Sequence, residues 1–178
     1  MAKWNIDPDH SVAAFKVRHM MVAHVRGQFN KLSGTVTYDQ DDPTVFSLEM
    51  MIDALGLLTG IAQRDEHLQS PDFFDMAVHP TIVFKSGAFT PGGGKGGKLA
   101  GLLTIHGVSK PVVLDLSFSG PIRSPEDFGG EITLGITATA TVNREEFGMI
   151  WNVPMDGGGV MVGKEIVIDL DIEADLEE

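Results

Sequence analysis

Strict alternation of apolar and polar residues dominates this chain and restricts what it can fold into. From Ile132 to Val142 every even-numbered residue is apolar, and the odd-numbered residues between them are threonine or glycine. A β-strand with one buried face and one solvent-facing face has this period of two. At about 3.3 Å per residue, the segment predicts one strand roughly 35 Å long.

The same alternation recurs along most of the chain. It covers residues 13–18, 29–39, 46–53, 82–85, 103–106, 112–118 and 166–173. With residues 132–142 this makes about eight strands, and Gly34 is expected to form a bend or bulge within the second. Eight antiparallel strands with one apolar face can close into a barrel, which removes exposed sheet edges. A β-sandwich is the competing all-β architecture, but strands of ten or more residues favour the barrel.

One segment has a helical period instead. Apolar residues and Asp65 recur at helical spacing between Leu58 and Leu68, which predicts one amphipathic helix. Thr59 is its expected N-cap, and Ser70 followed by Pro71 is expected to end it. Short helical turns are predicted after Pro71 and near residues 19–25. No linker or internal repeat is visible, so residues 1–178 are expected to form a single domain.

Composition excludes several functional classes. The formal net charge of −12 argues against nucleic acid and anionic membrane surfaces as partners. The absence of cysteine rules out disulfides, thiolate zinc sites and a cysteine nucleophile. No apolar run is long enough to span a membrane. The first residues lack the apolar core of a secretory signal, so a cytoplasmic location is expected, or a periplasmic one if a signal has been removed.

Three local motifs favour structural interpretations. The run from Gly92 to Lys98 contains GxxxxGK, but Leu99 replaces the Ser or Thr that a phosphate-binding loop needs, so a flexible hairpin loop is expected. The six histidines show no metal-ligand spacing, so neither a metal nor a cofactor is predicted. Asp65, His67 and Asp72 could perform acid–base chemistry, but their spacing better suits a cluster that pins the helix across a barrel mouth.

Five blocks, in order, resemble the YceI-like family. They are Trp4-x-Ile6-Asp7-x-x-His10-Ser11-x-x-x-Phe15-x-Val17-x-His19, Arg64-Asp65-Glu66-His67-Leu68-x-Ser70-x-Asp72-Phe73-Phe74-Asp75, Gly101-x-Leu103-Thr104-Ile105-x-Gly107-Val108, Arg144-x-x-Phe147-Gly148-Met149-x-Trp151 and Val162-Gly163-x-Glu165-Ile166-x-Ile168. The resemblance implies a lipocalin-like eight-stranded antiparallel barrel that is not an enzyme. It further implies a homodimer that stores or transports a polyisoprenoid, an isoprenoid quinone or a fatty amide. Many members are secreted, and the lack of a signal here is a departure from them.

A closed barrel with its apolar faces inward predicts the residues that bind the lipid. They are Phe15, Val17, Phe46, Leu48, Met50, Ile52, Phe84, Leu103, Leu114, Leu116, Ile132, Leu134, Ile136, Ile168 and Leu170. The pattern leaves open whether this lumen is hollow or filled by side chains. A filled barrel that acts as a protein interaction module, through its acidic C-terminal strand, is the alternative function, and a lipid-modifying enzyme is another.

Overall fold

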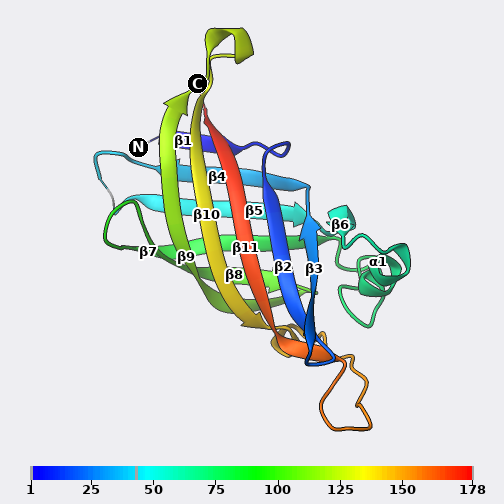
Figure 1. Cartoon of the computed structure of the whole chain (residues 1–178). Helices are drawn as coiled ribbons and strands as arrows, with labels where there is room; N and C mark the ends of the chain where they lie inside the picture. Colours follow the sequence, from blue (N-terminus) through cyan, green and yellow to red (C-terminus); the bar gives the residue numbers. More distant parts are fainter. Residues whose placement is uncertain (1, 43, 178) are drawn as a thin grey trace.

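Eight antiparallel strands close into a barrel in the computed structural model, which describes residues 2–42 and 44–177 (Figure 1). Hydrogen bonds between the first and last strands complete the ring. In spatial order the strands are β1 (Ala2–Ile6), β4 (Leu32–Tyr38), β5 (Phe46–Asp53), β7 (Thr81–Pro91), β8 (Gly96–Ile105), β9 (Val108–Arg123), β10 (Ile132–Asn143) and β11 (Val162–Leu176). The predicted barrel is therefore confirmed, and so is the long strand at residues 132–142.

Three further strands extend from β11 at one end of the barrel. They are β2 (Val12–His19), β3 (Ala23–Phe29) and the short β6 (Leu57–Leu58). β11 pairs with β2 through Asp171 and then with β1 from Ala174 onward. Beyond β6 this extension has no further strand partner in the described residues, and the chain between β5 and β7, which carries α1, lies beside it (Figure 1).

The helical elements are short. They comprise α1 (Ala62–Gln69) and three 3-10 turns, η1 (Ala54–Gly56), η2 (Glu126–Phe128) and η3 (Arg144–Phe147). Within the described residues, no helix has the length and apolarity needed to cross a membrane.

The structure corrects three local predictions. Residues 29–39 do not form one strand, because the chain turns after Phe29 and begins β4 at Leu32. Residues 19–25 form a β-hairpin turn and the start of β3 where a helical turn was expected. The helix starts at Ala62 with no side-chain cap, because the Thr59 hydroxyl hydrogen-bonds the Asp65 carboxylate instead, and none of its residues is buried.

The barrel interior falls into two halves. In the packed half, around β1 and β4, the rings of Tyr38, Phe46, Phe89 and Phe118 meet with centroids 4.8–6.5 Å apart. Fully buried aliphatic residues complete that half, among them Val36, Leu48, Leu134 and Ile172. The hollow half, around β2 and β3, contains a cavity.

Candidate functional site

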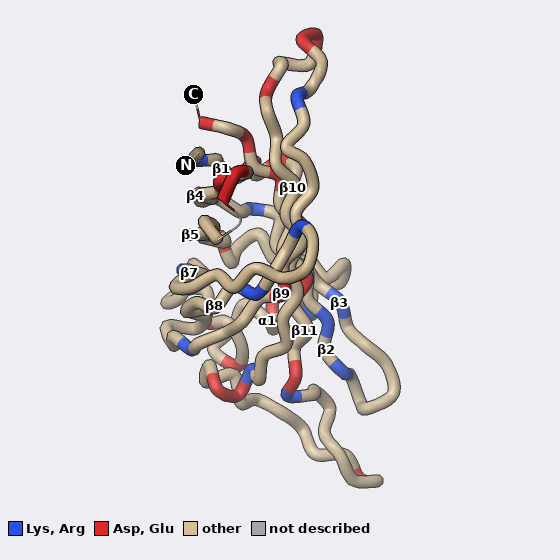
Figure 2. The backbone as a smooth tube through the Cα atoms, turned by 90° about the vertical axis from the view of Figure 1, so that its left-hand side faces the viewer, with Lys and Arg blue, Asp and Glu red and all other residues tan. Residues whose placement is uncertain are grey.

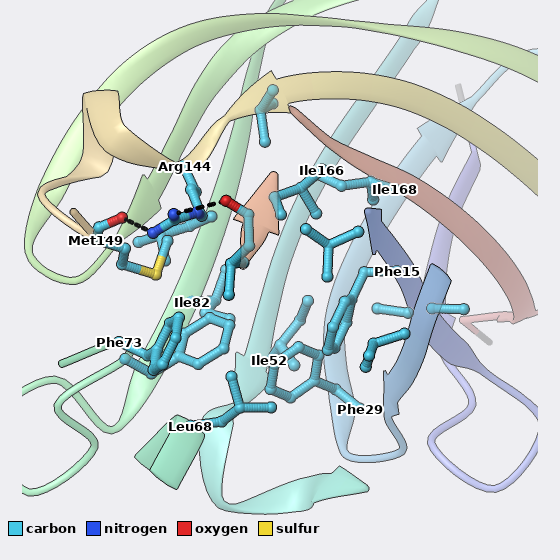
Figure 3. A pocket seen from close by; sticks show the side chains of 18 of the residues that line it. Phe15, Phe29, Ile52, Leu68, Phe73, Ile82, Arg144, Met149, Ile166 and Ile168 are labelled. Atoms are coloured by element: carbon cyan, nitrogen blue, oxygen red, sulfur yellow. Dashed lines mark hydrogen bonds between the residues drawn. The ribbon is translucent and has the colours of Figure 1, made fainter. Parts of the chain in front are cut away.

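The cavity in the hollow half has a volume of about 250 Å³ and an almost entirely apolar lining (Figure 3). Side chains from β2, β3, β5, β7, β8, β9 and β11 surround it. The aromatic and aliphatic lining includes Phe15, Phe29, Ile52, Leu68, Phe73, Phe74, Ile82, Phe84, Leu103, Leu114, Ile166, Ile168 and Leu170. Met50, Met149 and Met161 also line it, and flexible thioether side chains suit contact with apolar molecules of varied shape.

Two glycines, Gly27 on β3 and Gly101 on β8, each make room for an aromatic ring from the adjacent strand. The Phe15 ring lies so close to Gly27 that a Cβ there would lie 2.4 Å from a ring carbon. Phe84 lies against Gly101 in the same way, at 2.6 Å. Each ring therefore occupies the space that a neighbouring side chain would take. A side chain at either glycine would force the ring to move, and both rings line the cavity.

Aromatic side chains from the segments that follow α1 and η3 make ring contacts at the cavity. Phe74 meets Phe29 edge-on with ring centroids 5.6 Å apart. Trp151 lies 4.7 Å from His67 and 5.4 Å from Phe73, again between centroids. The segment that carries α1 is thus held to the barrel by ring contacts that also line the cavity. Several of these residues are only partly buried, so this side of the cavity lies near the protein surface.

The structure brings nine of the fifteen predicted residues to this cavity and leaves six away from it. The nine are Phe15, Val17, Met50, Ile52, Phe84, Leu103, Leu114, Ile168 and Leu170. The six are Phe46, Leu48, Leu116, Ile132, Leu134 and Ile136, which belong to the barrel core but do not line the cavity. Five of them are buried and Ile132 is partly buried, so they pack within the barrel core away from the cavity.

Sequence reasoning missed the residues that close the hollow half. The strand pattern does not mark Phe73, Phe74, Met149 or Trp151, because all four lie outside strands. The only signal for them was their place in the second and fourth family-like blocks.

Arg144 is the most unusual side chain of the lining. It is 2% exposed and follows β10, where η3 directs it inward. Its guanidinium donates to three backbone carbonyls, those of Gly163 at 2.8 Å, Val162 at 3.3 Å, and Met149. Figure 3 shows Arg144 beside Met149 in the lining of the cavity. Burial lowers the pKa of this guanidinium, and the nearby Glu145 carboxylate acts in the opposite direction. Arginine nevertheless keeps its charge in proteins, so a cation borders the apolar space.

The candidate acid–base cluster is divided between two structural contacts. Asp65 accepts hydrogen bonds from the Thr59 backbone N–H, at 3.0 Å, and from its hydroxyl group. Asp72 is paired separately with His67, at 2.9 Å. Of the three predicted residues, only His67 lines the cavity. The cluster therefore fastens the ends of α1 and does not form one acid–base constellation.

Two groups of residues have the composition of metal ligands, although the spacing of the histidines did not predict them. Asp75, His79 and His106 place ligand atoms within 4.8 Å of one another, and so do Asp7, His10 and Glu173. Neither group lines the cavity. His106 is also hydrogen-bonded through Nδ1 to the Phe147 carbonyl, and His10 to Asp7.

Comparison with known proteins gives consistent results. Residues 4–174 match the model of the YceI-like domain. UPF0312 proteins of several Staphylococcus aureus strains are 32% identical to this chain over the full length of both. BcnA of Burkholderia cenocepacia has a similar fold, with a TM-score of 0.79 and 22% identity over 94% of this chain and 98% of its own.

Two further solved structures share this fold. The YCEI protein of Campylobacter jejuni has a TM-score of 0.73 and 25% identity, over 90% of each chain. A polyisoprenoid binding domain from Saccharophagus degradans, implicated in plant cell wall breakdown, has a TM-score of 0.72 and 13% identity, over 99% of this chain and all of its own. The family match covers nearly every strand of the barrel and the segments that enclose the cavity. The chain belongs to the YceI-like family.

Proposed function

We propose that this protein binds a long-chain apolar lipid in the hollow half of its barrel and stores or transports it without chemical change. The observation that carries the proposal is an apolar cavity of about 250 Å³ inside a closed barrel. An apolar cavity of roughly 150 Å³ already binds benzene in preference to water. The space is therefore suited to a hydrocarbon chain and poorly suited to water.

The energetics predict that the cavity binds hydrocarbon chains of different kinds with little selectivity. Burial of each CH₂ group contributes about 0.8 kcal/mol, so ten buried groups contribute roughly 8 kcal/mol before the cost of ordering the chain. No single lining contact dominates such a sum. Polyisoprenoids, isoprenoid quinones and fatty amides are all candidates, and the polyisoprenoid binding domain of similar fold supports the first of these.

Mass spectrometry of an organic extract from the purified protein tests the proposal. Ile168→Trp places a large side chain in the cavity, whereas Val113→Trp changes an exposed position on β9 and serves as the control. We expect a stoichiometric long-chain lipid from the wild type and from Val113→Trp, and much less from Ile168→Trp. Equal lipid in all three proteins, or none in any of them after incubation with octaprenyl compounds and fatty amides, would contradict it.

A further inference from the structure

The charged and imidazole side chains that line the cavity are all basic. They are Arg18, His19, Arg64, His67 and Arg144, and no Asp or Glu of the described residues lines the cavity. This is opposite to the rest of the chain, in which 25 acidic residues outnumber 13 basic ones. The chain has only five arginines, so the cavity holds more than half of them.

None of these three arginines forms an ion pair or a hydrogen bond with a carboxylate of the described residues, although the Glu145 carboxylate acts on Arg144 from a greater distance. Arg144 donates only to backbone carbonyls, Arg64 donates to the hydroxyl and carbonyl oxygens of Thr59 at 2.8 Å, and Arg18 donates to the Met21 carbonyl at 2.8 Å. The ion pairs found across residues 2–42 and 44–177 involve lysine or histidine as the cation. A guanidinium has five N–H donors, so each of the three keeps donors that these hydrogen bonds do not use.

The hairpin formed by β2 and β3, which lies beside the cavity, also carries basic residues and no acidic ones. No acidic residue occurs between Ser11 and Tyr38, a stretch that includes all of β2 and β3. Lys16, Arg18 and Arg26 lie on these two strands, and Figure 2 shows the basic positions along them. β2 and β3 therefore place basic residues, and no acidic ones, beside the cavity of an acidic protein.

Arg144 shows why an anion would bind here. A buried cation that makes no direct ion pair carries a desolvation penalty that neutral carbonyls offset only in part. A carboxylate or a phosphate would supply the missing charge and could accept two parallel N–H bonds from a guanidinium. A neutral alcohol or amide would supply neither. His67 is a weaker candidate for this role, because Asp72 already pairs with it.

We propose that the lipid held in the hollow half carries an anionic head group, a carboxylate or a phosphate, which binds Arg144 and Arg64 while the tail fills the apolar cavity. This inference depends on the proposed function, since it assumes that a lipid tail occupies the cavity. It narrows the ligand to acidic lipids, and so gives neutral quinones and fatty amides a lower affinity than their acidic counterparts.

Probes that share one C18 tail separate the contribution of the head group from that of the tail. Affinities would be measured by calorimetry for oleate, oleyl phosphate, oleyl alcohol and oleamide. We expect oleate or oleyl phosphate to bind about tenfold or more tightly than the alcohol and the amide, as a charge-assisted hydrogen bond predicts. The ratio between oleate and oleyl phosphate distinguishes fatty carboxylates from lipid phosphates.

Substitution of Arg64 and Arg144 tests whether these two residues cause the preference for an anionic head group. Arg64→Gln and Arg144→Gln should each reduce the ratio of oleate to oleyl alcohol affinity to less than about threefold. Arg123→Gln, which removes an arginine that donates to Gly130 and does not line the cavity, should leave the ratio unchanged. Arg64 is partly exposed, so its variant remains informative if Arg144→Gln does not fold.

Two results would overturn the inference and leave lipid binding intact: equal affinity for the four probes, or an anion preference that both variants retain in full. Failure of every probe to bind would instead refute the proposed function, and this inference with it.

Discussion

The two halves of the barrel share the strands β5, β7, β9 and β11, yet one half is filled by side chains and the other contains the cavity. Ile168 and Ile172 lie on the same face of β11; the first lines the cavity, and the second is 1% exposed in the packed half. In the packed half, rings from β4, β5, β7 and β9 converge. Around Ile168 two rings lie against glycines, and β3 has no strand neighbour beyond β6. The alternation thus determines which side chains face the barrel interior. The positions of the aromatic side chains determine whether those side chains fill the interior or leave a cavity.

The largest expected difference between the halves is the cost of removing an aromatic ring. Phe46→Ala should lower the free energy of unfolding by about 3–5 kcal/mol, because three rings surround Phe46 and cannot all move into the void. Phe29→Ala should cost only about 1–2 kcal/mol, since that ring already borders free volume. Chemical denaturation of both variants gives the comparison. Equal costs would show that the two halves are equally well packed.

Enlarging a side chain should also destabilise the packed half more than the hollow half. Ile172→Trp is expected to destabilise the protein by about 1–3 kcal/mol through overpacking, whereas Ile168→Trp should cost less than about 1 kcal/mol because the cavity accommodates the indole. Thermal unfolding of the lipid-free proteins measures both. A larger loss for Ile168→Trp than for Ile172→Trp would contradict the division of the barrel.

Ser11 joins the halves where β11 changes partner. Its buried hydroxyl accepts from the Glu173 N–H at 3.1 Å and donates to the Glu173 carbonyl at 3.3 Å. Ser11→Ala should cost on the order of 1 kcal/mol, because it leaves the Glu173 N–H without this partner. Ser117→Ala, at an exposed position on β9, is the control and should be nearly neutral. A neutral Ser11→Ala would mean that the border between the halves does not need this hydrogen bond.

The smallest expected effect is that of pH at the same corner. His10 contacts Asp7 at 2.6 Å, and this hydrogen bond is the main reason that the pKa of His10 is raised above 6.5. Burial acts to raise the pKa of Asp7, but hydrogen bonds from His10 and the Asp9 backbone outweigh it, so that pKa falls below 3.8. The His10 contribution to stability is complete below 6.5 and is lost as pH rises through its folded pKa. The Asp7 contribution is complete above 3.8 and is lost as pH falls through its folded pKa.

The Asp7–His10 pair should therefore stabilise the protein most between these two values. The difference in unfolding free energy between the wild type and His10→Gln is expected to be largest near about pH 5 and to decline by about pH 8. A difference that stays constant over this range would show that the pair does not contribute.

The sequence predicted the barrel well because one observable, the period of two, determines both the strands and their inward faces. It predicted the site less well. Leu134 and Ile168 have the same pattern, yet only the second lines the cavity, and nothing local to either residue distinguishes them. Gly27 could not be connected with Phe15 before the register of β2 and β3 was known. The sequence places Arg144 in a family-like block, but it does not predict that this side chain is buried beside the cavity. The homodimer and the cytoplasmic location remain predictions.

The position of a bound chain tests the central claim most directly. A stearate with a nitroxide label on its tail would be added to protein with labelled methyl groups, and paramagnetic broadening would be mapped by NMR. We predict strong broadening at the methyl groups of Ile52, Ile82 and Ile168, which line the cavity, and little at Leu48, Leu134 and Ile172 in the packed half. Broadening of equal strength in both halves, or confined to the outer surface of the barrel, would contradict the account.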